Sequence, residues 1–264
     1  MTTTRIRRCG ETALLLDCAD LAEAVALAGR IEQLRPEALD VVAAARTVLV
    51  TARDASALRG LRRRLEALLA QDPPAAAPPS RNPLSENRIG ASDPNSGSGR
   101  GVADSVGGGG REVTIGVRYD GPDLAAVADL AGMSTEALVR THTSITWRAA
   151  FGGFAPGFFY LVDARELDAG ARDAGRPDVG GPAEAPAPTP ALPAVPRLGS
   201  PRARVPAGSV GLADRFCAVY PGASPGGWQL LGTTDAPLWD LDRPYPALLA
   251  PGMTVRFREE GGPR

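Results

Sequence analysis

His142 is the only histidine in the chain, so its imidazole is the only side chain whose ordinary pKa lies near neutrality. Such a group could act as a general acid or base in cleaving an amide bond, or it could be a helix-end histidine bonded to backbone. Arg202 and Arg204 lie between two prolines, and a guanidinium on rigid backbone can bind a carboxylate or phosphate through two parallel hydrogen bonds. Either arginine could instead form a structural ion pair. These three residues are the candidate catalytic groups.

Glycine, proline and aromatic residues are concentrated in three short stretches, at 153–161, 201–210 and 220–229. Because glycine permits sharp turns, proline fixes φ and aromatic rings offer flat walls, these stretches favour strands that bend around a ligand cleft. The aromatic rings could instead fill the core of a small barrel, and Ser209 could bond within a turn. A serine-hydrolase triad is not expected, because Ser209 lacks the Gly-x-Ser-x-Gly elbow. The candidate substrate-binding residues are Phe154, Pro156, Phe158, Ser209, Tyr220, Trp228 and Gln229.

Composition excludes several kinds of chemistry. The 264 residues include no lysine, so a Schiff-base lysine and the lysine of a phosphate-binding loop are both absent. No carboxylate cluster has metal-ligand spacing, and we predict no metal site in this chain. The formal net charge of −1 gives no electrostatic reason to expect binding to nucleic acid or to a membrane surface.

The chain is expected to be a cytoplasmic protein. Its first residues lack the apolar stretch of a signal peptide, and no apolar run reaches the roughly 20 residues that span a bilayer. Cys9, Cys18 and Cys217 are too few and too scattered for a disulfide framework or a zinc site, so free thiols are predicted.

The elements that must position these residues fall into two predicted domains. In 1–120, short strands around Gly10 precede a helix that begins at Asp20, and further strands alternate with a second amphipathic helix over 58–68. A last strand is predicted over 113–117. This order favours a small α/β sandwich with helices on one face of an antiparallel sheet. The polar, glycine-rich stretch 72–110 is predicted to be a disordered insertion.

The second predicted domain covers 121–264. A short helix and a helix capped by Ser134 lead to His142, after which many short strands separated by turn residues favour a closed barrel or a sandwich. The Pro/Ala-rich stretch 169–196 is predicted to be a flexible loop within this domain.

Several of these motifs occur in a fixed order between Glu136 and Phe257. They are His142, the run Gly-Phe-Ala-Pro-Gly-Phe-Phe-Tyr-Leu at 153–161, Pro-Arg-x-x-Val-Pro-Ala-Gly-Ser-Val at 201–210, Tyr-Pro at 220–221 and Ser-Pro-Gly-Gly-Trp at 224–228. This order resembles the allophanate hydrolase subunit 1 family, which includes the B subunit of 5-oxoprolinase and the histidine-kinase inhibitor KipI. The resemblance implies an α+β protein with a small N-terminal ferredoxin-like α/β sandwich followed by a cyclophilin-like β-barrel.

The resemblance also implies three functions. The first is the B subunit of an ATP-dependent 5-oxoprolinase that cleaves 5-oxo-L-proline to L-glutamate. Its partners would be a C subunit, similar to allophanate hydrolase subunit 2, and an A subunit of the lactam-utilisation type. ATP and Mg²⁺ would then be shared with a partner subunit. The alternatives are subunit 1 of allophanate hydrolase in urea degradation, and a KipI-like inhibitor of a sensor histidine kinase.

Overall fold

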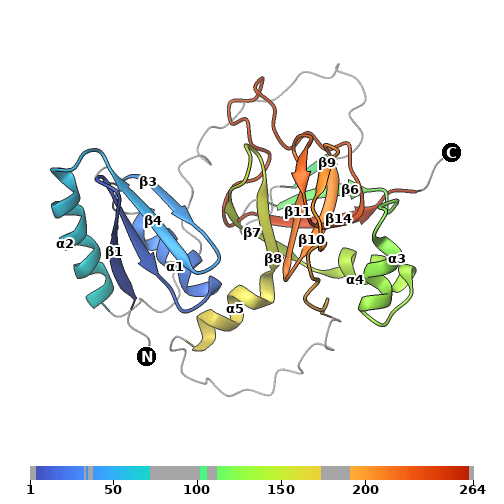
Figure 1. Ribbon diagram of the computed structural model, residues 1–264, viewed down its shortest axis with the longest axis horizontal. Coiled ribbons are helices and arrows are strands. Elements are labelled where there is room, and N and C mark those ends of the chain that lie inside the picture. The colour runs from blue at the N-terminus through green and yellow to red at the C-terminus, as the bar shows by residue number, and fades with distance from the viewer. Residues whose placement is uncertain are drawn as a thin grey trace. The chain divides into compact units, whose positions relative to one another are not determined.

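The computed structural model describes residues 4–32, 34, 38–71, 102–105, 112–173 and 191–261. These residues form two compact units (Figure 1). Of these described residues, those from 4 to 71 and from 165 to 173 belong to the first unit, and those from 102 to 164 and from 191 to 261 belong to the second.

The first unit is a four-stranded antiparallel sheet in the order β1-β2-β4-β3. Each strand hairpin is followed by a helix, as in a ferredoxin-like βαββαβ unit whose last strand has been moved to the start. The elements are β1 (Arg5–Cys9), β2 (Ala13–Asp17), α1 (Leu21–Glu32), β3 (Ala38–Ala43), β4 (Thr47–Ala52) and α2 (Ala57–Ala70).

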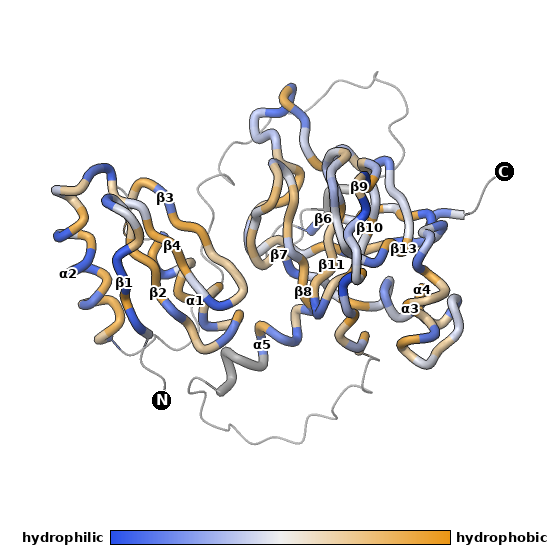
Figure 2. Tube along the Cα trace, in the orientation of Figure 1, coloured by the Kyte–Doolittle hydropathy of each residue, from blue (hydrophilic) through white to orange (hydrophobic). Residues whose placement is uncertain are grey.

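One face of this sheet carries the core of the first unit. In β4 the buried residues alternate with partly exposed ones, so Val48 and Val50 point to one face. Both helices pack their apolar residues into the same cluster, among them Leu27 of α1 and Leu61 of α2. Figure 2 shows hydrophobic and hydrophilic residues interspersed along α2, as expected for a helix with one buried side.

The predicted start of α1 is confirmed by its hydrogen bonds. The Asp20 carboxylate accepts from the Glu23 N–H at 2.8 Å, and the Glu23 carboxylate accepts from the Ala19 N–H at 2.6 Å. The first bond satisfies a donor that a helix N-terminus otherwise leaves unpaired, and the second fixes the residue before the N-cap.

The second unit is built on an eight-stranded sheet in the order β13-β10-β11-β8-β7-β14-β6-β5. The Arg118–Thr233 bridge joins the end of β6 to β13, so the sheet closes into a nearly complete barrel. A separate two-stranded ribbon pairs β9 with β12. The elements are β5 (Val102–Ser105), β6 (Glu112–Val117), α3 (Leu124–Leu130), α4 (Thr135–Ser144), β7 (Trp147–Gly152), β8 (Phe159–Asp163), β9 (Arg202–Val205), β10 (Ser209–Ala213), β11 (Phe216–Val219), β12 (Ser224–Gly226), β13 (Gln229–Thr233) and β14 (Thr254–Glu259). The helix α5 (Ala164–Asp173) follows β8 in the chain, and from Arg165 on it belongs to the first unit.

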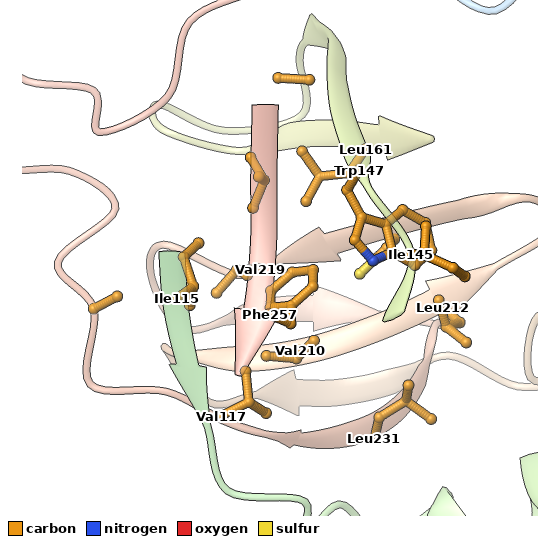
Figure 3. Packing of buried hydrophobic residues seen from close by; sticks show 14 of the residues in the cluster. Ile115, Val117, Ile145, Trp147, Leu161, Val210, Leu212, Val219, Leu231 and Phe257 are labelled. Atoms are coloured by element: carbon orange, nitrogen blue, oxygen red, sulfur yellow. The ribbon is translucent and has the colours of Figure 1, made fainter. Parts of the chain in front are cut away.

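The barrel is filled by one hydrophobic cluster. Figure 3 shows Phe257 of β14 among Ile115, Val210 and Val219, which come from three other strands. The helix α4 begins at Ser134, whose hydroxyl accepts from the Ala137 N–H as predicted. The predicted α+β class, with a small N-terminal sheet and a barrel, is confirmed.

Three predictions about organisation need correction. The strand over 113–117 was expected in the N-terminal sheet, but β6 pairs in parallel with β14 and lies in the barrel. Within the expected insertion 72–110, residues 102–105 form β5 on the edge of that sheet, and the rest lies outside the described residues. Within the expected loop 169–196, α5 continues to Asp173 and Val195 is buried and pairs with Asp214, while 174–190 lies outside the described residues.

Along the described part of the chain, no helix combines the length and the apolar character needed to cross a membrane.

Candidate functional site

A cluster of aromatic side chains lies on the outer face of the barrel. Successive residues of a strand point to opposite faces, and in β11 the side chain of Cys217 enters the barrel core while Ala218 belongs to a second cluster. The second cluster consists of Phe158, Val205, Ala213, Ala218, Tyr220, Trp228 and Leu230, with Ala155, Tyr160 and Phe216 packed against it. Because Val205 lies on β9, the β9–β12 ribbon contributes to this cluster.

The aromatic rings meet mainly edge to face, which is a favoured geometry for aromatic pairs. The centroid of the Phe158 ring lies 5.4 Å from that of Tyr220 and 5.6 Å from that of Trp228. All three side chains are buried. Phe154 contacts this group at 5.2 Å from Phe158 but is 61% exposed.

Phe154 also has an unusual backbone. Its φ is +68°, in the left-handed region that a bulky side chain rarely adopts. Strained residues of this kind are concentrated at ligand sites, because the surrounding structure must hold them in place. Phe154 is therefore the member of the aromatic cluster best placed to contact a ligand.

Arg202 is held in place by Asp123, which lies directly before α3. Its Nη2 donates to both carboxylate oxygens of Asp123, at 2.6 and 2.9 Å, and its Nη1 donates to the Trp228 carbonyl at 3.3 Å. The same carboxylate accepts from the Leu230 N–H at 2.7 Å. The expected use of Arg202 as a ligand for a bound anion is corrected here, because its charge is already neutralised by a partly buried carboxylate. The residue ties β9 to α3 and β13.

Arg204 lies on the same strand but is exposed. Neither a hydrogen bond nor an ion pair of its side chain is found within the described ranges. Of the two predicted arginines, Arg204 is thus the one that remains available to a carboxylate or a phosphate.

His142 lies inside the barrel core and has no exposed surface. Its Nδ1 is 2.8 Å from the Tyr119 hydroxyl, its Nε2 is 3.4 Å from the Cys217 Sγ, and its ring lies 4.7 Å from that of Phe257. Burial lowers the pKa of His142 from 6.5 to about 3, and burial also raises the pKa values of Tyr119 and Cys217. All three groups are therefore neutral at pH 7.

The structure separates His142 from the two arginines, so the prediction that these three residues form one catalytic site is also corrected. The imidazole faces the interior of the barrel, while Arg202 and Arg204 lie on the β9–β12 ribbon outside it. Without access to solvent or to a ligand, His142 cannot exchange a proton with a substrate in this geometry. Its contacts are those of a structural residue, but the imidazole meets the side chains of Tyr119 and Cys217 and not the backbone groups of the expected alternative. The His142 carbonyl also accepts from the Trp147 Nε1 at 3.2 Å.

The remaining predicted residues are placed as follows. Ser209 is buried at the start of β10, and Pro156 is exposed in the loop that carries Phe154. The Gln229 amide donates to the Pro196 carbonyl at 3.1 Å. The structure thus brings together Phe154, Phe158, Tyr220 and Trp228 and places Arg202 beside them.

Sequence reasoning missed two members of this region. Asp123 was not singled out, although a carboxylate after Gly-Pro and before a helix is a common N-terminal signal. Ser224, the first residue of the Ser-Pro-Gly-Gly-Trp motif, has a buried Oγ for which no hydrogen-bond partner is found among the described residues. An unpaired buried hydroxyl costs about 1–3 kcal/mol, and this one is covered by protein.

The described residues contain no group of three or more His, Cys, Asp or Glu side chains that could hold a metal ion. The candidate site consists of the aromatic cluster with the exposed Phe154, and the exposed Arg204 lies on the β9–β12 ribbon that contributes Val205 to this cluster. Such groups suit the binding of a small polar molecule with a flat or apolar part.

The fold and this region have counterparts among known proteins. A family model for the carboxyltransferase domain, subdomain C and D, matches residues 4–179 and 187–249, so the chain belongs to that family. The solved structure of TTHA0988 is 29% identical, with a TM-score of 0.60, over 98% of this chain and 41% of that chain. The urea carboxylase of Kluyveromyces lactis has a TM-score of 0.58 over 98% of this chain and 22% of that one, but at 15% identity it shows the fold alone.

Curated relatives are more similar in sequence. The B subunit of 5-oxoprolinase from Escherichia coli O157:H7 is 40% identical over 137 residues, which are 52% of this chain and 51% of that protein. The B subunit of 5-oxoprolinase from Bacillus subtilis is 35% identical over 150 residues, or 56% of this chain and 52% of that protein. The chain thus spans about half the length of these relatives.

Proposed function

We propose that this chain is the B subunit of an ATP-dependent 5-oxoprolinase, which opens 5-oxo-L-proline to L-glutamate together with the A and C subunits. One observation carries the proposal: relatives from three bacteria, 35–40% identical to this chain, are all named as the B subunit of 5-oxoprolinase. The likeness to urea carboxylase concerns the fold, and no observation favours the allophanate hydrolase or kinase-inhibitor alternatives.

In this proposal the chain supplies part of a substrate site. The substrate is a small lactam with a carboxylate, so it needs a flat surface for the ring and a cation for the acid group. Phe154 offers an exposed aromatic face, and Arg204 offers an exposed guanidinium. The Asp123–Arg202 pair holds the β9–β12 ribbon that carries Arg204 and Ser224.

The chain's described residues show no dedicated site for ATP or Mg²⁺. They contain no three-ligand group for a metal, and the sequence contains no lysine to bind phosphates. We therefore assign most of the ATP and Mg²⁺ binding to a partner subunit, and derive no phosphate-transfer step from this chain. We also place the protein in the cytoplasm, which its three free cysteines support.

The test is reconstitution of the complex. The chain is co-expressed with the A and C subunits, and glutamate released from 5-oxoproline is measured with and without ATP. We expect release only when ATP and all three subunits are present. A complete complex that releases no glutamate would overturn the proposal.

Within an active complex, Phe154→Ala tests the site. The matched control is Leu130→Ala, which removes another exposed apolar side chain of the same unit. We expect Phe154→Ala to raise the KM for 5-oxoproline while Leu130→Ala leaves it unchanged. Equal kinetics for the two variants would remove Phe154 from the substrate site.

A further inference from the structure

Arg197 lies over the indole ring of Trp228, next to the aromatic cluster. Its Cζ is 5.9 Å from the centre of that ring, which is within the range of a cation–π contact. Trp228 itself is buried, and the rings of Phe158 and Tyr160 each lie 5.6 Å from its own. The guanidinium therefore adds a positive charge to the wall of aromatic rings.

The backbone on both sides of Arg197 is fixed by hydrogen bonds. Val195 and Asp214 exchange two of them, at 2.9 and 2.6 Å, and the Leu198 N–H donates to the Gly227 carbonyl at 2.8 Å. Val195 is also buried in the barrel core. Because the backbone is held and the guanidinium already lies over a ring, a ligand that binds Arg197 has little further motion to restrict.

No carboxylate neutralises Arg197 among the residues that the structure describes. Its side chain is exposed and forms neither an ion pair nor a hydrogen bond with any of them, whereas Arg202 is paired with Asp123. Burial raises the pKa of Tyr220, and the positive charges of Arg197 and Arg202 oppose that rise, so both guanidinium groups lie near the Tyr220 hydroxyl. The N–H donors of Arg197 are thus free to bind an anionic group.

Arg197 is better prepared for this role than Arg204. Both side chains are exposed, but Arg197 already lies over an aromatic ring. A ligand of Arg204 must immobilise a long side chain for which the described residues provide no such support. A guanidinium that lies over a ring keeps the donors at its edge, and two of them match the two oxygens of a carboxylate.

We propose that Arg197, lying over Trp228, binds the carboxylate of a small molecule whose apolar part lies against the aromatic cluster. The carboxylate accepts two parallel hydrogen bonds from the guanidinium. In the proposed function this molecule is 5-oxo-L-proline, and its carboxylate binds Arg197 in preference to Arg204. The identity of the ligand rests on the proposed function, whereas the position of the carboxylate site does not.

The experiment follows the indole N–H of Trp228 by NMR in the isotope-labelled full chain. The chain contains three tryptophans, and the signal of Trp228 is the one that Trp228→Phe removes. Trp147, buried in the barrel core, is the internal reference. On titration with 5-oxo-L-proline, we expect the Trp228 signal to shift to saturation with a Kd of about 1 mM and the Trp147 signal to stay in place. The neutral amide of 5-oxoproline should bind at least about tenfold more weakly, because it lacks the negative charge.

Arg197→Ala should weaken the binding of 5-oxo-L-proline at least about tenfold. The matched control is Arg140→Ala, which removes another exposed arginine of the second unit, on α4, and should leave the Kd unchanged. An unchanged Trp147 signal in both variants shows that the barrel is intact. The comparison of the acid with its amide needs no variant, so it tests the proposal even if Arg197→Ala does not fold.

Several outcomes would overturn the carboxylate site. They are a Trp228 signal that does not shift in the wild type, equal binding of the acid and its amide, and equal binding by the wild type and Arg197→Ala. Binding that is lost in Arg204→Ala but kept in Arg197→Ala also overturns it, because the carboxylate then lies on Arg204.

The site and the proposed function can fail separately. If binding depends on Arg197 but the complete complex releases no glutamate, the carboxylate site stands and the proposed function fails. If the complex releases glutamate and Arg197→Ala leaves the KM for 5-oxoproline unchanged, the proposed function stands and the carboxylate site fails.

Discussion

The burial of His142 leads to a specific prediction of how the free energy of unfolding depends on pH. The folded chain keeps the imidazole neutral, because burial lowers its pKa from 6.5 to about 3. The unfolded chain accepts the proton below about pH 6.5. Between about pH 3 and pH 6.5, protonation of the imidazole therefore favours the unfolded chain. The free energy of unfolding falls as the pH falls from 7 toward 3, and the contribution of His142 is fully present only above pH 6.5.

The size of the effect can be worked out at pH 5. There the unfolded imidazole lies about 1.5 pH units below its pKa, and each unit corresponds to about 1.4 kcal/mol, so the expected loss relative to pH 7 is about 2 kcal/mol. The result depends little on the folded pKa, because that value is already far below 5. His142 is the only histidine, so no other side chain has an ordinary pKa between 5 and 7.

The assay is urea unfolding followed by tryptophan fluorescence. All three tryptophans, Trp147, Trp228 and Trp239, lie in the second unit, so the signal reports on the unit that contains His142. The control is His142→Phe, which keeps an aromatic ring at this position without a titrating group. It should be less stable overall, since the Tyr119 hydroxyl loses its partner, but its stability should be the same at pH 5 and pH 7.

Two results would refute this reasoning. A wild-type chain whose stability changes by less than about 0.5 kcal/mol between pH 7 and pH 5 would mean that the imidazole reaches solvent and titrates normally. A change of about 2 kcal/mol that persists in His142→Phe would show that other groups cause it.

Four further variants test the framework of the second unit. Asp123→Ala leaves Arg202 and a backbone N–H without their acceptor and should cost about 3 kcal/mol in urea unfolding; a loss below 1 kcal/mol would mean that the pair does not hold the ribbon. Gly157→Ala and Gly252→Ala both place a side chain at a φ above +80°, but only at Gly157 does the added Cβ also meet the backbone, at Leu238. Gly157→Ala should therefore be less stable than Gly252→Ala by at least about 1 kcal/mol. Equal stability of the two variants would show that the loop at Gly157 and the loop at Leu238 move apart freely. Tyr119→Phe removes the partner of the buried imidazole and should cost about 1–2 kcal/mol in thermal unfolding, and an unchanged melting temperature would argue against that bond.

The helices and strands of the first unit could be predicted from the sequence because the residues that signal each of them are close together in the chain. The Asp20–Glu23 pair marks a helix start within four residues, and the alternation of Val48 and Val50 marks a half-buried strand within three. The sheet that β6 joins could not be predicted in this way. Its alternating residues Val113, Ile115 and Val117 suit the buried face of any sheet, and its partner β14 lies about 140 residues further along the chain.

The site was predicted in part for a similar reason. Phe154, Phe158 and Trp228 were identified as flat aromatic side chains near turns, and the structure brings them together. The sequence left open whether Arg202 binds a ligand or forms an ion pair, because its partner Asp123 is 79 residues away. A guanidinium looks the same in sequence whether it is free to bind an anion or already neutralised by a carboxylate.

The sequence alone determined which chemical groups this protein has: one imidazole, no lysine, rigid Gly/Pro turns beside aromatic residues, and the motifs of its family. Tertiary structure alone decided which of those groups meet solvent. It buried His142 among Tyr119, Cys217 and Phe257, and it left Phe154 and Leu241 on the surface. The physical reason is that burial and pairing depend on residues distant in the chain, and these determine whether a group keeps its ordinary charge and reactivity.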